Sequence, residues 1–239
     1  MDFEGKKALV TGAGAIGGLG HAVAGILAAG GADVVVTGRD PERGAQVVDD
    51  IGGGVRFVQA DLGEIEDARR LADSAGRVDI LINNAAIMLG APRDLDEYDA
   101  AFAVNVRAPY LLTTALAPRM AANGGGSIVN VTSTAAGLGT PRIAVYGATK
   151  AALESLTRAW AIEFAPANVR VNAVAPGPIL TAKAVAALGP DLGGHGETVP
   201  LARPAGPAEV AEVVAFVAGD RASYMTGAIV PADGGRAAT

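Results

Sequence analysis

The sequence of 239 residues contains no cysteine, which excludes disulfide bonds and thiolate metal sites. Its two histidines, His21 and His195, do not have the spacing of a metal-binding pair, so we expect no metal site. Basic residues are fewer than acidic ones, with 19 lysines and arginines against 25 aspartates and glutamates. Nucleic-acid-binding proteins usually have a basic surplus or a basic stripe, and we therefore expect no nucleic-acid partner.

Long apolar runs are absent as well. No segment reaches the roughly 18 apolar residues that a membrane helix needs, and residues 1–10 do not resemble a signal peptide. We therefore expect no membrane partner, and the lack of cysteine is consistent with a cytoplasmic location. There is also no Gly-x-Ser-x-Gly elbow with a Ser/His/Asp set, which disfavours hydrolysis.

What the sequence does contain is an alternation of short runs rich in valine and isoleucine with longer stretches rich in alanine and leucine. Such continuous apolar runs are typical of parallel strands that are covered on both faces. The alternation predicts an α/β fold, a doubly wound seven-stranded parallel sheet with helices on both faces. The expected strands are residues 7–11, 33–37, 55–59, 79–83, 127–131, 170–174 and 228–231, and the expected helices are residues 20–29, 41–51, 64–75, 96–122, 145–165 and 207–218.

No linker, repeat or change of composition divides the chain, so we expect residues 1–239 to form a single domain. The stretch 182–200 differs, because it is rich in glycine, proline and alanine and interrupts the rhythm of strands and helices. We call residues 182–200 the lid segment, since long irregular loops often cover functional sites. Asp40-Pro41 and Gly206-Pro207 are expected to open the helices that follow them.

A glycine-rich loop joins the first expected strand to the first expected helix. Gly12, Gly14 and Gly17 match Gly-x-Gly-x-x-Gly, whose glycines let the backbone approach a pyrophosphate at a helix N-terminus. The motif alone is weak evidence, and a glycine-rich turn without a ligand is the alternative. Its place between a strand and a helix favours a dinucleotide site.

The end of the second expected strand indicates which dinucleotide binds. NAD-specific folds usually have an acidic residue there, whereas this chain has Gly38 and Arg39. The Arg39 guanidinium is suited to a 2′-phosphate, so we expect NADP(H) to be favoured over NAD(H). The alternative is that Arg39 is a solvated loop charge. We assign the adjacent Asp40 to the helix cap.

Further motifs follow along the chain. They are Thr11-Gly12 with Gly18-Leu19-Gly20, Asp61-Leu62, Asn83-Asn84-Ala85-Ala86, Asn105, Ser133, Tyr146-Gly147-Ala148-Thr149-Lys150, Pro176-Gly177 with Thr181, and Tyr224 through Gly235. Each is weak alone, but in this order and spacing they are specific. The chain resembles the short-chain dehydrogenase/reductase family along nearly its whole length. The similarity is to members of the Tyr-x-x-x-Lys type, such as 3-oxoacyl thioester reductases and sugar, polyol or steroid dehydrogenases.

The resemblance implies a Rossmann-type fold and an oxidoreductase that transfers a hydride between NADP(H) and a carbonyl or secondary alcohol of a small-molecule substrate. It implies that Asn105, Ser133, Tyr146 and Lys150 are catalytic and that Asn83 supports the central sheet. It places the adenine at Asp61 and Leu62, and the nicotinamide carboxamide and phosphates at Ile179 and Thr181. The full set of expected cofactor contacts is Gly12, Gly14, Gly17, Gly18, Leu19, Arg39, Asp61, Leu62, Asn84, Ala85, Tyr146, Lys150, Pro176, Gly177, Ile179 and Thr181.

The chain departs from the family pattern in two places. Five residues, 13–17, separate Thr11-Gly12 from Gly18-Leu19-Gly20, where the family usually has three. The sequence therefore does not say which glycines contact the pyrophosphate. Ala86 stands where the family usually has glycine, and it adds one methyl group to the turn after the fourth strand.

The spacing of Tyr146 and Lys150 places both side chains on one face of a helix. A free tyrosine has a pKa of about 10, which makes it a poor base at pH 7. We expect the Lys150 ammonium and the positive nicotinamide to lower the pKa of Tyr146 toward the range useful for proton transfer. Ser133 follows the fifth strand, where its hydroxyl can stabilise charge on the substrate oxygen. We also expect Lys150 to reach the nicotinamide ribose.

Asn105 is expected to add a proton path. Pro109, four residues later, has no N–H, so the Asn105 carbonyl loses its usual helical partner. A buried carbonyl needs another donor, and water is the obvious one. In the resembled family this carbonyl holds a water that connects the lysine to solvent.

A different class of function is a non-catalytic NAD(P)-binding regulator, since a fold does not fix a function. That alternative predicts a broken catalytic set, whereas all four expected catalytic residues are present. The wider Tyr–Lys spacing of enoyl reductases with a related fold is absent, which disfavours reduction of carbon–carbon double bonds.

Members of the family commonly form tetramers or dimers through two long helices, here expected at residues 96–122 and 145–165. Small residues on the second helix suit close packing between subunits, although burial within one subunit explains them equally well. These residues are Ala148, Ala151, Ala152 and Ala159. The substrate is expected beside the lid segment in a mostly apolar lining, formed by Ile87, Met88, Ala135, Leu138, Arg142 and Pro178.

Overall fold

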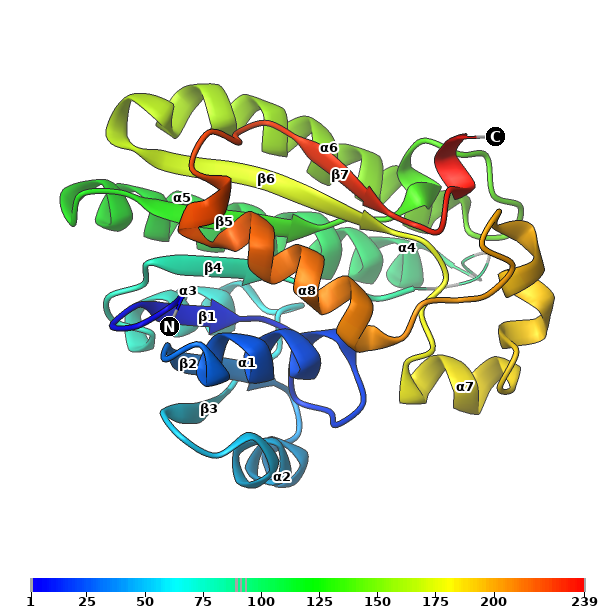
Figure 1. The fold of residues 1–239 in the computed structure, drawn as a ribbon, viewed down its shortest axis with the longest axis horizontal. Helices are drawn as coiled ribbons and strands as arrows, with labels where there is room; N and C mark the ends of the chain where they lie inside the picture. The colour runs from blue at the N-terminus through cyan, green and yellow to red at the C-terminus, as the bar shows by residue number, and fades with distance from the viewer. Residues whose placement is uncertain (1, 89, 91, 93, 239) are drawn as a thin grey trace.

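The computed structural model describes residues 2–88, 90, 92 and 94–238. At its centre is a seven-stranded sheet in the order β3-β2-β1-β4-β5-β6-β7, with every neighbouring pair parallel (Figure 1). This confirms the expected doubly wound α/β fold. The strands are β1 (Lys7–Val10), β2 (Asp33–Gly38), β3 (Val55–Gln59), β4 (Ile80–Asn83), β5 (Gly126–Val131), β6 (Val169–Pro176) and β7 (Ile229–Ala232).

Helices cover both faces of the sheet and enclose two cores (Figure 1). Because successive side chains of a strand point to opposite faces, Ala8 and Val10 of β1 enter one core while Leu9 enters the other. The first core is closed by α1 (Leu19–Ala29), α2 (Pro41–Ile51) and α8 (Pro207–Ala218). The second is closed by α3 (Ile65–Ser74), α5 (Ala108–Ala122) and α6 (Ala144–Phe164).

The expected continuous helix over 96–122 is wrong, because the structure divides it into three parts. α4 (Leu95–Phe102) leads into a π-helical turn at Ala103–Arg107, and α5 follows. In this turn the Ala108 amide donates to the Ala103 carbonyl, five residues earlier. Pro109 lacks the N–H that would continue the α-helical pattern from Asn105, which explains why the helix is interrupted at this point.

The lid segment contains two short helices that the sequence did not predict, α7 (Ala182–Leu188) and a 3₁₀ segment at Leu192–Thr198. None of the residues of α7 is buried, but its first amide, on Ala182, donates to the Gly17 carbonyl at 3.3 Å. The lid helix therefore lies against the glycine-rich loop that follows β1 (Figure 1). Four further 3₁₀ turns span Thr134–Ala136, Ala165–Ala167, Asp220–Ala222 and Arg236–Ala238.

Both proline-marked helix starts are confirmed. The Asp40 side chain caps α2 by accepting from the amides of Glu42 and Arg43 at 3.0 and 3.1 Å. At α8, the Gly206 amide donates to the Glu209 carboxylate at 2.8 Å. Within the described part of the chain, no helix combines the length and apolar character needed to span a membrane.

Candidate active site

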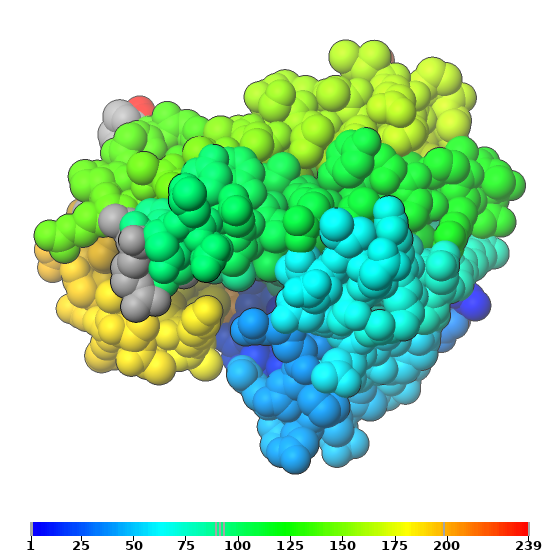
Figure 2. All heavy atoms as spheres, turned by 180° about the vertical axis from the view of Figure 1, so that it is seen from behind, coloured from blue at the N-terminus to red at the C-terminus, as the bar shows by residue number. Residues whose placement is uncertain are grey.

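The predicted site residues gather at one edge of the sheet, because they follow the carboxyl ends of parallel strands. Gly12 follows β1, Arg39 follows β2, Asn84 follows β4 and Ser133 follows β5. The strand order reverses between β1 and β4, and in doubly wound sheets ligands bind at such a switch point. Figure 2 shows the surface hollowed there, between the yellow lid segment and the blue segments near the N-terminus.

Two glycines of the phosphate loop are required by close approach to neighbouring backbone. Gly12 has φ +67°, and a Cβ on it would lie 2.6 Å from the Cα of Ala85. A Cβ on Gly14 would lie 3.2 Å from the Cα of Gly38. The loop therefore packs against the turn that follows β4 and against the end of β2, and a side chain at either position would push these segments away from the loop.

The loop ends at the N-terminus of α1, which is free to receive an anion. The N-cap is Gly18, which offers no side-chain cap, and no acidic residue lies in the first helical turn. The amides of the first turn of a helix lack internal partners, and the positive end of the helix dipole favours negative charge. The glycine cradle and this uncapped helix start fit the pyrophosphate of a dinucleotide.

Thr11 and Asn84 fix the phosphate loop to the turn after β4. The Thr11 hydroxyl accepts from the amides of Asn84 and Ala85, each at 3.0 Å. In return, the Asn84 side-chain amide donates to the carbonyls of Thr11 at 2.8 Å and Gly12 at 3.2 Å. The Asn84 side chain is thus engaged in shaping the loop. Sequence reasoning gave Thr11 no role of its own, although its place at the end of β1 was a usable signal.

Arg39 is exposed beside the end of β2, and its backbone is held from the neighbouring strand. The Gln59 side-chain amide donates to the Arg39 carbonyl at 2.9 Å. Asp61 lies two residues after the end of β3, and its carboxylate accepts from the Gly63 amide at 2.9 Å. The carboxylate of Asp40, the residue after Arg39, is occupied as the cap of α2.

Tyr146 and Lys150 lie in the first turns of α6 on the same face, as their spacing predicts. The Lys150 ammonium lies 5.7 Å from the centre of the Tyr146 ring and donates to the Val131 carbonyl at 2.7 Å. Only 1% of Lys150 is exposed, and this burial lowers the pKa of its ammonium from 10.5 to about 8. The carbonyl at the end of β5 therefore fixes the ammonium beside the phenol.

The expected lowering of the Tyr146 pKa by its protein neighbours is wrong for the protein alone. Burial is the largest influence and raises the pKa of the phenol, because the charged phenolate loses solvation. Hydrogen bonding with Ser133 acts in the opposite direction and lowers the pKa of Tyr146, though by less. In the protein alone, burial therefore outweighs the hydrogen bond with Ser133 in its effect on the Tyr146 pKa.

Ser133 occupies the extended residue between β5 and the 3₁₀ turn Thr134–Ala136. Its hydroxyl oxygen accepts from the Ala135 amide at 3.2 Å, which leaves the hydroxyl proton available to another acceptor. The influence of Ser133 on the Tyr146 pKa places the two hydroxyls together. A substrate oxygen between them would meet two donors.

Asn105 lies in the π-helical turn and is fully buried. Its side chain accepts from the Ile87 amide at 2.8 Å and donates to the Ile87 carbonyl at 2.9 Å. It also donates to the Thr149 hydroxyl at 3.0 Å. The Asn105 side chain therefore joins the turn after β4 to α6. Sequence reasoning missed Thr149 in this connection, although it stands directly before Lys150.

The remaining predicted cofactor residues fall into two groups. Leu19 and Leu62 are each 7% exposed, so their side chains belong to the cores and only their backbone can face the cleft. The residues after β6 stay near the edge of the sheet: Gly177 packs against Asp233, Ile179 pairs with Ala205, and Thr181 caps α7. Asn83 supports the sheet as expected, because its side-chain amide donates to Asn130 of β5 at 2.8 Å.

Two residues of the expected substrate lining, Ala135 and Leu138, border a shallow groove of about 490 Å³. The groove runs along the start of α6, and none of its described lining residues carries a charge. Met88 is 57% exposed, and Arg142 is exposed with a φ of +69°. Arg142, which was expected in the substrate lining, is therefore exposed to solvent.

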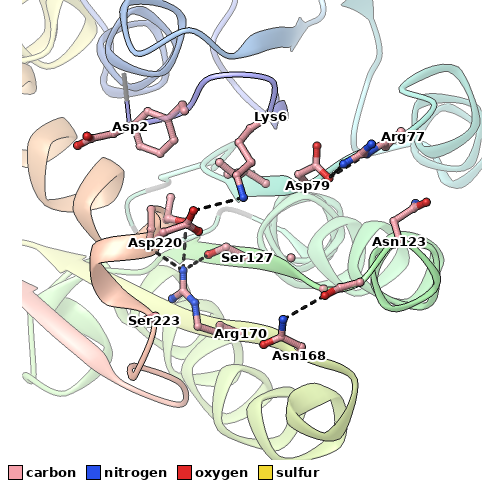
Figure 3. Close-up of a pocket in the computed structure, with 17 residues that line it drawn as sticks. Asp2, Lys6, Arg77, Asp79, Asn123, Ser127, Asn168, Arg170, Asp220 and Ser223 are labelled. Carbon is pink, nitrogen blue, oxygen red and sulfur yellow. Dashed lines mark hydrogen bonds and ion pairs between the residues drawn. The ribbon is translucent and has the colours of Figure 1, made fainter.

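A second cavity, of about 290 Å³, opens at the opposite edge of the sheet, beside the start of β4 and β5 (Figure 3). Four of its charged side chains form two ion pairs, Arg77–Asp79 at 2.9 Å and Lys6–Asp220 at 3.4 Å. The Arg170 guanidinium donates to the Ser127 hydroxyl and to surrounding carbonyls. None of the predicted site residues lines this cavity, and its groups serve the structure. Among the described residues, no cluster of side chains could hold a metal ion.

Comparison with known proteins identifies relatives over the whole chain. A family model described as enoyl-(acyl carrier protein) reductase matches residues 12–237. L-xylulose reductase from Bos taurus is 37% identical, and the alignment covers 100% of this chain and 99% of that protein.

Two solved structures share the fold closely. One, described as a short chain dehydrogenase/reductase family protein, has a TM-score of 0.95 and 49% identity, with 100% of both chains covered. The other, described as an NAD(P)-dependent gluconate 5-dehydrogenase from Beutenbergia cavernae with NADP bound at low occupancy, has a TM-score of 0.91 and 36% identity. That alignment covers 100% of this chain and 100% of the other.

Proposed function

Because the chain belongs to the short-chain dehydrogenase/reductase family, we propose that it interconverts a carbonyl and a secondary alcohol with Tyr146 as the acid/base. Family membership makes it an NAD(P)-dependent oxidoreductase that acts on CH–OH or C=O groups of small molecules. The observation that carries the residue assignment is the position of the Lys150 ammonium, 5.7 Å from the Tyr146 ring at the edge of the sheet where the phosphate loop lies.

We propose NADP(H) as the preferred cofactor, because Arg39 is exposed at the end of β2 while Asp40 is committed to capping α2. The phosphate loop and the start of α1 would hold the pyrophosphate, and Asp61 and Leu62 would border the adenine. The nicotinamide would supply or accept the hydride. The expected contacts of Ala85, Pro176, Gly177, Ile179 and Thr181 belong to the same proposal, and they surround the carboxyl ends of β4 and β6.

The protein's own part in the reaction is proton transfer and charge stabilisation. In the direction of reduction, the Tyr146 phenol donates its proton to the substrate oxygen, and Ser133 donates a hydrogen bond to the same oxygen. The Lys150 ammonium, fixed by the Val131 carbonyl, stabilises the phenolate that remains. The Asn105 carbonyl, in the π-helical turn, holds the water through which the proton is replaced.

Replacing Tyr146 with phenylalanine tests the assignment. We expect Tyr146→Phe to lower kcat by roughly 10²–10⁴-fold, the usual worth of a positioned acid/base, while NADPH still binds. Turnover is followed by absorbance at 340 nm with a panel of carbonyl compounds. Tyr110→Phe, which removes a hydroxyl from a half-exposed tyrosine of α5, is the control. If the parent protein binds NADPH but turns over no member of the panel, the regulatory alternative is favoured.

Reversing the charge at position 39 tests the cofactor preference. Arg39→Asp should lower the ratio of kcat/KM for NADP to kcat/KM for NAD by roughly 10–100-fold, the worth of a charge-assisted contact. Arg158→Asp, at an exposed arginine of α6, is the control and should leave the ratio unchanged. A ratio that stays the same in Arg39→Asp would show that Arg39 is not the selector.

We further propose that residues 1–239 act as one dinucleotide-binding and catalytic domain, covered by the lid segment, in the cytoplasm. We also propose a homotetramer or homodimer built through α5 and α6. The small residues of α6 support this assembly, because burial within the subunit does not account for them. Ala148 and Ala159 are exposed, and Ala151 and Ala152 are only partly buried.

A further inference from the structure

Thr149 connects two parts of the candidate active site, α6 and the π-helical turn, through a single hydroxyl. It lies between Tyr146 and Lys150 on α6 and is fully buried. Its hydroxyl donates to the Tyr146 carbonyl at 2.7 Å and accepts from the Asn105 side-chain amide at 3.0 Å. Both hydrogen-bonding directions of the hydroxyl are therefore used.

The partner on the other side of Thr149 is itself fixed. The Asn105 side chain is held by the amide and the carbonyl of Ile87, at 2.8 and 2.9 Å. The chain of contacts runs from the turn after β4, through the π-helical turn, to the first turn of α6. The helix turn that presents Tyr146 is thus tied to the segment that would border the nicotinamide.

We propose that Thr149 is a positioning residue, which holds the Tyr146 turn of α6 in register with Asn105 and the turn after β4. This inference rests on the proposed function. Without the hydroxyl, the Asn105 amide loses a buried acceptor and the Tyr146 carbonyl loses a donor, so the two segments are free to shift. Proton transfer depends on sub-ångström placement of the donor, and such a shift slows the chemical step.

The same helix provides a matched control in Thr157. It is also fully buried, and its hydroxyl donates to the Leu153 carbonyl at 2.8 Å and accepts from the Asn130 side chain at 2.8 Å. Thr157 therefore makes the same two kinds of hydrogen bond about three turns away from Tyr146. Replacing either threonine with valine removes the same groups from the same kind of environment.

The experiment compares Thr149→Val, Thr149→Ser and Thr157→Val, with kcat normalised to the stoichiometry of NADPH binding. We expect Thr149→Val to lower kcat roughly 10–100-fold while the Kd for NADPH changes less than about threefold, because Ile87 still holds Asn105. Thr149→Ser should restore kcat to within about threefold of the parent. Thr157→Val should lower the free energy of unfolding in urea about as much as Thr149→Val does, but its kcat should equal that of the parent.

Several results would overturn the inference. Parent-like kcat in Thr149→Val, or an equal loss in Thr157→Val, would show that the hydroxyl has no special effect on the reaction. If Thr149→Val does not fold, Thr149→Ser still decides, since a large loss of kcat in that variant contradicts a role for the hydroxyl. A parent protein that shows no turnover would overturn the proposed function together with this inference, whereas turnover kept in Thr149→Val overturns this inference alone.

Discussion

At the scale of one residue, the buried Lys150 belongs to the candidate site but lowers the stability of the folded chain. A lysine ammonium with 1% exposure has lost nearly all of its hydration, and a single hydrogen bond to Val131 does not replace it. The pKa lowered from 10.5 to about 8 expresses this cost, which corresponds to roughly 3 kcal/mol. An apolar side chain of similar length would avoid it.

The sign of the effect follows from the two pKa values. Below pH 8 the ammonium is charged in both the folded and the unfolded chain, so the whole cost of burial is present. Between pH 8 and 10.5 the folded chain releases its proton first, and stability rises with pH. Above 10.5 both states are neutral, and the cost disappears.

We therefore expect Lys150→Met to have a free energy of unfolding, measured with urea at pH 7, that exceeds the parent's by about 2 kcal/mol. This figure takes the lost hydrogen bond to Val131 into account. The gain should disappear near pH 10.5, and activity should be lost at every pH. Lys183→Met, at an exposed lysine of α7, is expected to change neither quantity. A parent-like or lower stability of Lys150→Met at pH 7 would contradict the cost assigned to Lys150.

At the scale of elements, the interruption of the helix between α4 and α5 places Asn105. A π-helical turn inserts an extra residue into the helix and changes which backbone groups are paired, and such turns are common at functional sites. Here Ala103–Arg107 form the turn, and Pro109 lies just beyond it. The sequence identified Pro109 as the residue that disturbs the helix, but it predicted a freed carbonyl within a continuous helix and not a change of helix type.

Pro109→Ala supplies the missing N–H and is expected to favour an α-helical path through this turn. Asn105 would then rotate away from its partners, and kcat should fall roughly 10–100-fold with an altered pH profile. Pro118→Ala provides the control, because Pro118 lies exposed inside α5, away from the turn. Unchanged turnover and an unchanged pH profile in Pro109→Ala would mean that the proline does not serve the proton path.

At the scale of the whole molecule, α6 has two functional sides. One side carries Tyr146 and Lys150 toward the sheet, and the other presents Ala144 and Ala148 to solvent along an uncharged groove. Helices whose outward face is made of small uncharged residues can pack closely against a partner. The proposed assembly would pack against the small residues on the outer side of α6.

Ala148→Glu tests the assembly, because two carboxylates brought together across a symmetric interface repel each other and lose hydration. Light scattering should show a molar mass at most half that of the parent. Ala186→Glu, on exposed α7, introduces the same charge elsewhere and should leave the mass unchanged. A parent that is already monomeric, or an Ala148→Glu variant of parental mass, would contradict the proposed interface.

The sequence by itself determined the seven strands and five of the six expected helices. Short apolar runs rich in valine and isoleucine predicted all seven strands to within a few residues, because a strand buried on both faces must be continuously apolar. Asp40-Pro41 and Gly206-Pro207 located two helix starts, because capping depends on neighbours along the chain. Family membership also followed from motifs that are local in sequence.

Only the tertiary structure decided how those elements act on one another. The raised pKa of Tyr146 comes from burial, and burial depends on residues that are distant along the chain. The contact between Gly17 and Ala182 and the hydroxyl bridge at Thr149 likewise join segments far apart in sequence. Local patterns carry propensities and caps, whereas solvation and long-range hydrogen bonds exist only once the chain has folded.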